Sequence, residues 1–284
     1  MKAERARIFF ALALVMLFSA ARAESTWDDA TARLRAVSLP PQQVAVIVEQ
    51  ARARGLAPKN VEPWVDRLER LAQSGIPPAI GGERLAQGLA KGVPLERLDR
   101  ALAELYDDLG WLNGLLERTT AQAERRDNPR RYELALRAGE AALRAGFDRA
   151  AFEHALGTKP LTLQQAIALS QAAGSLRAAN IDQGEIVRAL ERLGPAGINA
   201  GEIQRLEARF VAELTAGQSA QVAFEEFKAA LRALVGQADA AEKSAAQREE
   251  LRQEMRETLR APGGLDMRPG GGVSPGAGHS KGLR

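Results

Sequence analysis

Several residue types are scarce in this chain of 284 residues. It contains no cysteine and two histidines, and aromatic residues make up 5% of the sequence. The lack of cysteine excludes disulfide bonds, cysteine-based metal sites, a catalytic thiol and a lipid anchor on cysteine. Catalysis by histidine is not favoured, because His279 lies in a Gly/Pro-rich tail and His154 is the one histidine in the predicted folded region. The length is sufficient for a substantial hydrophobic core in one or two domains.

Motifs that carry well-known chemistry are also absent. The sequence contains no G-x-x-x-x-G-K-[ST] phosphate loop, no G-x-G-x-x-G following a strand pattern, and no H-E-x-x-H, EF-hand loop or G-x-S-x-G elbow. We therefore predict no catalytic residues, no cofactor-binding residues and no metal ligands. The chain is predicted not to be an enzyme.

The sequence lacks a real excess of charge of one sign. Its net charge is +3, but residues 1–23 contain four basic residues and one acidic residue. The remainder contains 35 basic and 35 acidic side chains, and the signs also balance within 24–160 and within 161–284. A nucleic-acid-binding surface needs a concentrated basic patch. We therefore expect no nucleic-acid partner.

A long hydrophobic run occurs once, close to the N-terminus. Three basic residues precede an 11-residue apolar run over 8–18, which is too short to cross about 30 Å of hydrocarbon as a helix. Ala21-Arg22-Ala23 supplies the small residues that signal peptidase accepts before its cleavage site. Residues 1–23 are thus predicted to be a signal peptide cleaved between Ala23 and Glu24. An amphipathic or membrane-spanning N-terminal helix is the alternative.

The expected location follows from the same segment. The sequence has no lipobox cysteine, and no later stretch approaches 18 consecutive apolar residues. We therefore expect a periplasmic or secreted protein that keeps no stable membrane anchor after cleavage.

The rest of the chain is predicted to be all-α. It is rich in Ala, Leu, Glu, Arg and Gln, which favour helices, and it lacks strand-like alternation. A small or helix-ending residue followed by a large apolar residue recurs at intervals close to multiples of 17 or 18. Such a pair suits the end of a helix, where Gly or Asn adopts a left-handed conformation. The pairs are Gly55-Leu56, Gly75-Ile76, Gly92-Val93, Gly146-Phe147, Asn180-Ile181 and Gly197-Ile198.

The spacing of these pairs predicts the architecture. Helices of about 11–14 residues joined by short turns bury one face only by packing on neighbouring helices. Two such helices give a period of about 35 residues, which is typical of αα repeats. We expect an array of short antiparallel helical hairpins, either solenoid-like or an irregular bundle.

Capping patterns mark where several helices begin. Segments 181–186 and 198–203 have the same pattern, in which Asp182 or Asn199 is followed three residues later by glutamate. Such pairs are typical of an N-cap residue and its capping-box partner. Thr162 with Gln165 is predicted to form another capping box.

One short element resembles a known group of proteins. Leu89-Ala90-Lys91-Gly92-Val93-Pro94 is similar to an element of uncharacterised exported α-helical proteins of bacteria. The resemblance covers six residues and implies export and a helical fold, but no activity.

Seven leucines with 3,4 spacing predict one unusually long helix, from Leu95 to Leu116. This stripe is either a dimer seam or a central core helix surrounded by its own neighbours, and the second interpretation is preferred. Gly110 and Gly114 lie in the same helix and are expected to let another backbone approach closely.

A second long helix is predicted over 219–260, after a helical repeat domain over 24–218. Its first half carries a candidate interaction or packing seam formed by Phe224, Phe227, Leu231 and Leu234. Its second half, 239–260, is charge-mixed and is expected to project as a solvated helix or a coiled coil. Residues 261–284 are rich in Gly and Pro and are predicted to be disordered.

Two groups of polar residues are candidates for a catalytic or metal-binding site. Asp107 and Asp108 lie near Trp111, and a carboxylate pair beside an aromatic ring is typical of glycosidases. Adjacent helical residues point about 100° apart, so we expect these carboxylates to be solvated and not to face one substrate. His154 is expected to be a half-buried structural histidine and not a metal ligand.

These observations predict a non-enzymatic interaction or scaffold module with a protein or peptide partner. The 219–260 helix offers a second docking surface or a means of self-association as a homo-oligomer. One alternative is a cell-envelope enzyme that uses carboxylates, which requires acidic side chains converging in one cleft. The other is a chaperone-like holdase, which requires an exposed apolar patch above ~600 Å².

Overall fold

The computed structural model describes residues 26–156, 160–193 and 198–260, and these residues confirm the all-α prediction. They form twelve helices and no strand, apart from an isolated bridge between Thr120 and Leu161. The expected signal peptide with its cleavage site at Ala23 and Glu24, and the tail 261–284, lie outside the described residues. In the order of the chain, the helices are α2 (Trp27–Ala36), α3 (Pro41–Ala53), α4 (Pro58–Gln73), α5 (Ala79–Ala90), α6 (Leu95–Thr119), α7 (Gln122–Asp127), α8 (Pro129–Arg144), α9 (Arg149–Leu156), α10 (Leu163–Ala178), α11 (Gln183–Leu190), α12 (Ala200–Thr215) and α13 (Ala220–Arg260).

The chain divides into two compact units. Unit 1 ends at Ala238, and unit 2 begins at Asp239 within the continuous helix α13. In unit 2, the side chains described between 240 and 256 are exposed, except that of Ser244, which is half-buried. No helix within the described ranges combines the length and apolar character needed to span a membrane.

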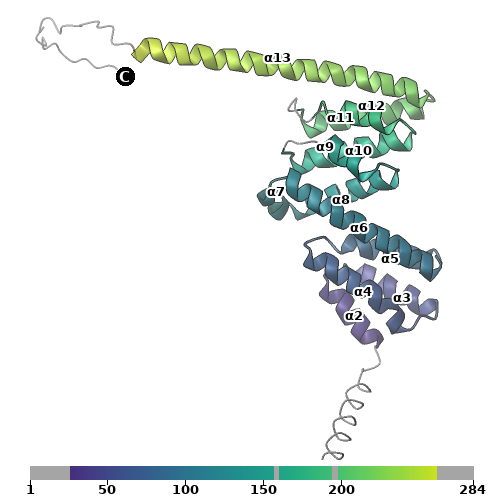
Figure 1. Ribbon diagram of the computed structural model, residues 1–284. Helices are drawn as coiled ribbons and strands as arrows, with labels where there is room; N and C mark the ends of the chain where they lie inside the picture. The colour runs from purple at the N-terminus through teal and green to yellow at the C-terminus, as the bar shows by residue number, and fades with distance from the viewer. Residues whose placement is uncertain (1–25, 157–159, 194–197, 261–284) are drawn as a thin grey trace, which may run out of the picture. The chain divides into compact units, whose positions relative to one another are not determined.

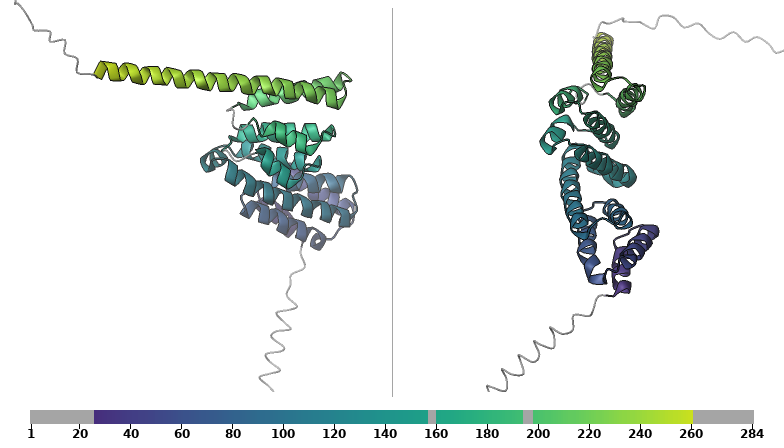
Figure 2. Two further views of the ribbon diagram at one scale, coloured as in Figure 1. Left: turned by 45° about the horizontal axis from the view of Figure 1, so that its top comes forward. Right: turned by 90° about the vertical axis from the view of Figure 1, so that its right-hand side faces the viewer.

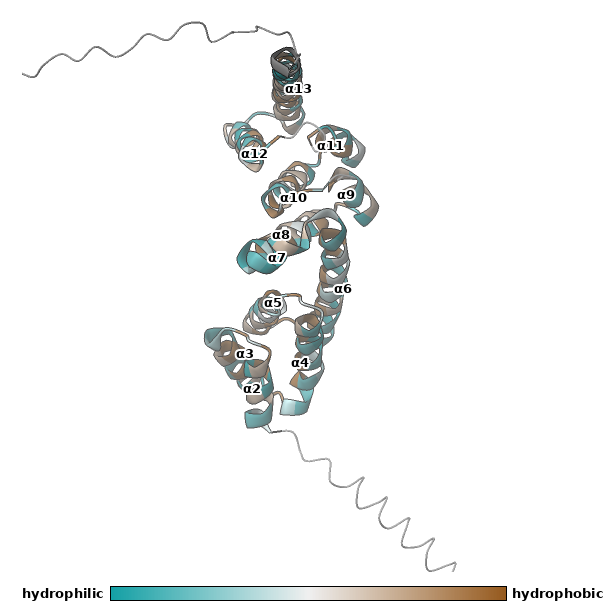
Figure 3. Ribbon diagram, turned by 90° about the vertical axis from the view of Figure 1, so that its left-hand side faces the viewer, coloured by the Kyte–Doolittle hydropathy of each residue, from teal (hydrophilic) through white to brown (hydrophobic). Residues whose placement is uncertain are grey.

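The helices of unit 1 form two layers, and Figure 1 shows them stacked in the order of the chain. Helices pack on their next-but-one neighbours in the chain, so α8, α10 and α12 form one row and α9 and α11 lie beside each other in the second row. Figure 3 shows these two rows nearly end-on, and the right-hand view of Figure 2 shows the helices stacked in chain order. Several polar contacts in unit 1 join residues 31 to 36 positions apart, whereas the contact of Arg84 with Glu140 spans 56 positions.

One continuous core lies between the layers and extends from Leu34 in α2 to Leu231 in α13. Helices in the same unit differ in length more than expected: α9 and α11 have 8 residues, whereas α4, α8, α10 and α12 have 16. The predicted range of about 11–14 residues was therefore too narrow. The short helices α9 and α11 are each followed by a long helix in the opposite layer. The average spacing of turn residues gives only the mean length of such a pair and does not show that one helix is short and the other long.

Left-handed residues end the helices where the sequence predicted them. Gly55, Gly75, Gly92 and Gly146 have φ between 67° and 91°, and Asn180 has φ of 61°. The apolar residue that follows each of them donates its backbone N–H to the carbonyl five residues earlier, at 2.9–3.2 Å. This pairing satisfies a carbonyl that the helix end leaves without a partner. The sixth predicted site, Gly197, lies outside the described residues.

The predicted N-caps are also present. The side chains of Asp182 and Asn199 each accept a bond from the backbone N–H three residues later, at 3.0 Å. Thr162 accepts one from Gln165 N–H at 3.1 Å. The reciprocal bond of a full capping box is present at Asn199 and Thr162, whereas the cap at Asp182 is formed by its own side chain.

The long leucine helix is a core helix of unit 1. Six of its seven leucines, from Leu98 to Leu116, are buried within this single chain. α6 packs against α4, α5 and α8, so its stripe is already covered and is not a dimer seam.

The expectation for the two glycines of this helix was wrong. A Cβ atom added at Gly110 would meet no atom within 4 Å, and one at Gly114 would meet only the Arg118 guanidinium, at 3.6 Å. Among the described residues, no backbone atom of another helix lies within 4 Å of a Cβ placed at either glycine. The close approach occurs at Gly174 in α10, where an added Cβ would lie 3.3 Å from Ala142 Cα in α8.

Candidate functional site

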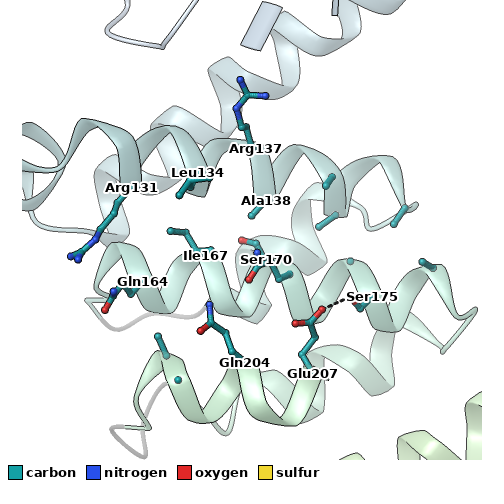
Figure 4. Close-up of a pocket in the computed structure, with 18 residues that line it drawn as sticks. Arg131, Leu134, Arg137, Ala138, Gln164, Ile167, Ser170, Ser175, Gln204 and Glu207 are labelled. Atoms are coloured by element: carbon teal, nitrogen blue, oxygen red, sulfur yellow. Dashed lines mark hydrogen bonds between the residues drawn. The ribbon is translucent and has the colours of Figure 1, made fainter. Parts of the chain in front are cut away.

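A groove of about 950 Å³ lies along the row formed by α8, α10 and α12. We call it the α8–α10–α12 groove. The three helices that form it point in the same direction, because the short helices α9 and α11 return the chain between α8 and α10 and between α10 and α12. Gln165 near the start of α10 donates to the Ile198 carbonyl just before α12, at 3.0 Å, which brings their N-terminal ends together. Figure 4 shows Arg131 of α8 at the same end as Gln164 of α10.

Small residues form the base of the groove. On the α8 side it is lined by Leu134, Ala138, Ala141 and Ala145, whose spacing of 4, 3 and 4 places them along one face of the helix. On the α10 side, Gly174 lets α10 approach the backbone of α8. The groove therefore exposes helix backbone and short side chains over most of its length, with the half-exposed Leu134 as a larger apolar contact.

Polar side chains line the other wall and the base. The Ser175 hydroxyl donates to Glu207 Oε1 at 2.7 Å, which joins α10 to α12 across the groove (Figure 4). Gln164, Gln171 and Gln204 also line the groove and are exposed. Each of these three amides offers two donors and an acceptor to a bound molecule.

The two arginines that line the groove differ in their ion pairing. Arg137 donates to Glu83 at 2.6 Å and to Glu133 at 2.9 Å, and Figure 4 shows it turned away from α10. Burial lowers the pKa of Arg137, but these two carboxylates outweigh that effect and leave the pKa raised. Arg131, in contrast, is exposed and forms no ion pair with any described residue. It contributes a full positive charge near the N-terminal ends of the three helices.

The groove does not gather acidic side chains. Glu207 is its one carboxylate among the lining residues, and its Oε1 already accepts a bond from Ser175. Within the described ranges, no group of three or more His, Asp or Glu residues is arranged to hold a metal ion. Acid–base catalysis by a carboxylate pair therefore has no geometric basis in this groove.

The predicted seam of α13 lies inside unit 1. Phe224, Phe227 and Leu231 are buried, and Leu234 is partly buried against the same core. The Phe224 and Phe227 rings stack with their centroids 6.1 Å apart, and Phe210 of α12 meets Phe227 edge-on at 6.3 Å. These residues fasten α13 to α12 and are covered within the chain.

The expectation that Asp107 and Asp108 are solvated holds for Asp107, whose side chain is 74% exposed, but not for Asp108, whose side chain is 25% exposed. Both carboxylates bind the same Arg149 Nη2, that of Asp108 at 2.8 Å, and the Arg149 guanidinium also lies 5.7 Å from the centre of the Trp111 ring. A long arginine on α9 spans the angle between two adjacent residues of α6, which the helix geometry of α6 alone cannot show. The two acids therefore join α6 to α9 and are occupied by this cation.

The expectation for His154 was also wrong in part. Its side chain is 73% exposed, not half-buried, and Nε2 lies 2.8 Å from Glu191 Oε1. The pair links α9 to the end of α11. No third ligand completes a metal site among the described residues.

The groove itself was missed by the sequence analysis. The sequence pattern that could have indicated the groove is the helix face formed by Leu134, Ala138, Ala141 and Ala145. On this face, alanine occupies three positions where a packed helix usually has a large apolar residue. Such a stripe occurs equally in tightly packed helices. What the sequence could not show is that this face lies next to Gly174 and Gln204, which belong to two later helices.

No match to this chain was found in comparisons with models of protein families, with curated proteins or with solved structures. The site must therefore be interpreted from its own geometry.

Proposed function

We propose that this chain is an exported, non-enzymatic helical-repeat module that binds a protein or peptide segment in the α8–α10–α12 groove. The observation that carries the proposal is the groove of about 950 Å³ formed by three helices that point the same way. It combines a base of small residues with exposed amides and an unpaired guanidinium. Concave faces of stacked helices are common binding surfaces for extended partners.

The arrangement of charges supports a binding module over an enzyme. The carboxylates that were weighed as catalytic, Asp107 and Asp108, are bound to Arg149 outside the groove. The groove carboxylate, Glu207, has no second carboxylate among the lining residues. An enzyme that uses two carboxylates requires them about 5–10 Å apart across the substrate.

The distribution of apolar side chains supports a defined partner over a holdase. The large apolar residues that are exposed among the described residues are few, and they come from α3, α8, α12 and α13. A holdase needs a contiguous apolar patch above ~600 Å². Scattered exposed apolar residues are ordinary on protein surfaces and do not imply binding of unfolded chains.

The repeat and export parts of the proposal have separate support. Packing of most helices on a next-but-one neighbour, with several polar contacts between residues 31 to 36 positions apart, supports a repeated hairpin. The basic and apolar pattern of residues 1–23 supports export.

Crosslinking in the cells that make the protein tests the proposed function. A photo-reactive amino acid is placed at Ala178 or Gln204, which are exposed in the groove, and at Ala101, which is exposed on α6, as the control. We expect a discrete adduct from the two groove positions and none from Ala101. The adduct should disappear in the Ala141→Arg variant, because a long cation would fill the groove without disturbing buried residues.

Other outcomes contradict the proposal. Equal labelling from Ala101, or adducts that persist in the Ala141→Arg variant, would show that the groove is not the binding surface. Hydrolysis of a cell-wall polymer by the purified chain, with loss of activity in Glu207→Gln, would favour the enzyme instead.

A further inference from the structure

The two ends of the α8–α10–α12 groove differ in charge. Arg131 lies at the end where α8, α10 and α12 begin, and Glu207 lies further along toward their C-terminal ends. The backbone dipoles of three parallel helices add to this, because their N-terminal ends carry partial positive charge. Glu124 and Glu202 accept from the backbone N–H of Leu163 and of Asn199, and thus occupy the beginnings of α10 and α12. Among the arginines that line the groove, Arg131 is the one that forms no ion pair with a described residue.

The walls of the groove favour an occupant that satisfies its own backbone hydrogen bonds. α8, α10 and α12 use their backbone groups within each helix, so the groove has no free strand edge. An extended peptide would leave most of its N–H and C=O groups against alanine and glycine, which is costly. A helix leaves none of its central backbone groups unpaired and buries one apolar face.

The dimensions of the groove fit this occupant. The α8 wall from Arg131 to Ala145 rises about 21 Å, which is about four turns of helix. The alanines of this wall and Gly174 of α10 have short side chains or none, so the axis of another helix can approach the base of the groove closely. Apolar residues at positions i, i+3, i+4 and i+7 of the occupant would meet this base, as in other helix-in-groove complexes.

We propose that the groove binds an amphipathic α-helix of a partner protein, antiparallel to α8, α10 and α12, with its acidic C-terminal turn at Arg131. This inference rests on the proposed function and specifies the class of partner. In this orientation the negative end of the bound helix meets Arg131, and its positive N-terminal end lies toward Glu207. The dipole of the bound helix then opposes those of the three parallel helices, which is the favourable arrangement.

Two displayed peptide libraries test the proposal against the purified full-length chain. Both contain peptides of about 16 residues with the same amphipathic pattern, and one carries central prolines that prevent helix formation. We expect binders from the helical library with Asp or Glu enriched in the last turn. Binding should be lost in Ala141→Arg, whose circular dichroism and melting confirm that the chain is folded.

Charge reversal tests the direction of the helix. Arg131→Glu should weaken the selected helical peptides by about tenfold or more, because an attractive contact becomes a repulsive one. Arg130→Glu is the matched control: Arg130 is exposed on the same turn of α8 but does not line the groove, and the effect should stay below about twofold. A second selection on the Arg131→Glu variant should enrich Lys or Arg in the last turn instead.

The remaining outcomes separate this inference from the proposed function. Binders from the proline library that are lost in Ala141→Arg would refute the helical partner and leave a groove-binding module. Helical binders that are indifferent to Arg131→Glu would refute the antiparallel direction. If neither library yields a binder sensitive to Ala141→Arg, the helical partner is wrong. The proposed function fails with it only if crosslinking from Ala178 and Gln204 also labels nothing.

Discussion

Single glycines decide how closely two helices approach in this molecule. Gly174 lies where a Cβ atom would be 3.3 Å from Ala142 Cα, which is backbone and cannot move aside by rotating. Gly110 lies on α6 with open space at the same position. Identical substitutions at these two sites should therefore have opposite effects.

We expect Gly174→Ala to lower the free energy of unfolding by about 1–3 kcal/mol, because α8 and α10 must separate slightly. Gly110→Ala should raise it by about 0.5–1 kcal/mol, since alanine favours the helix and meets nothing. Urea unfolding of both variants measures these changes. Equal stabilisation by the two substitutions would show that the contact between α8 and α10 is looser than described.

A buried carboxylate on α8 is a second feature at this scale. Glu140 is 7% exposed and binds both Arg84 of α5, at 2.9 Å, and Arg144, at 2.7 Å. It holds α5 against α8 through charges that the sequence analysis did not single out. The arginines are partly exposed, so water screens part of this attraction.

Glu140→Gln should lower the free energy of unfolding by about 1–3 kcal/mol, because one charge is lost while two guanidinium groups stay near a buried site. Glu153→Gln is the control: its pair with Arg118 is about half exposed on both sides, and the change should stay below about 1 kcal/mol. Chemical denaturation compares the two. A larger loss in Glu153→Gln than in Glu140→Gln would contradict this account.

At the scale of elements, the first turns of α13 belong to the core of unit 1. Phe224 and Phe227 are 0% and 3% exposed and stack on each other beside Phe210 of α12. Lys228 lies over the Phe224 ring, with its Nζ 4.7 Å from the ring centroid. This part of the helix is thus held by buried aromatic contacts.

We expect Phe224→Ala and Phe227→Ala each to lower the free energy of unfolding by about 3–5 kcal/mol, since each leaves a cavity in the core. Val222→Ala, at a residue 51% exposed on the same helix, should change it by less than about 0.5 kcal/mol. Thermal and urea unfolding provide the measurement. Unchanged melting of the phenylalanine variants would mean that α13 is not packed on α12.

At the scale of the whole molecule, burial disfavours ionisation of both tyrosines of the chain. Burial raises the pKa of Tyr132 to about 12 and also raises the pKa of Tyr106. The Tyr132 hydroxyl donates to Asn113, whereas the buried Tyr106 hydroxyl has no hydrogen-bond partner among the described residues. In the unfolded chain, tyrosine ionises near pH 10.

These shifts predict a loss of stability at alkaline pH. Above about pH 10 the unfolded chain releases tyrosine protons that the folded chain retains, so the free energy of unfolding falls as pH rises toward 12. The stabilisation is fully present below pH 10. Tyr132→Phe should remove about 1–2 kcal/mol of this fall between about pH 10 and 12.

Urea unfolding at a series of pH values, together with tyrosinate absorbance, tests this prediction. Tyrosinate should form together with the loss of helical circular dichroism. Titration of both tyrosines near pH 10 in a chain that keeps its helical signal would contradict their burial.

The local elements were largely predictable, and their partners were not. Left-handed turns at Gly55 and Asn180 and caps at Thr162 and Asn199 follow from a few adjacent residues, because helix ends are fixed by backbone conformation and nearby side chains. The pairing of Arg149 with both Asp107 and Asp108 was missed, since it depends on where α9 packs.

The sequence by itself determined that this chain forms helices and where most of them begin and end. These properties depend on contacts within one or two turns. The tertiary structure alone decided that α8, α10 and α12 lie side by side and that Arg131 lines their groove without an ion-pair partner among the described residues. Contacts between residues more than 30 positions apart depend on how each helix face fits its neighbours, and a periodic pattern of apolar residues does not contain that choice.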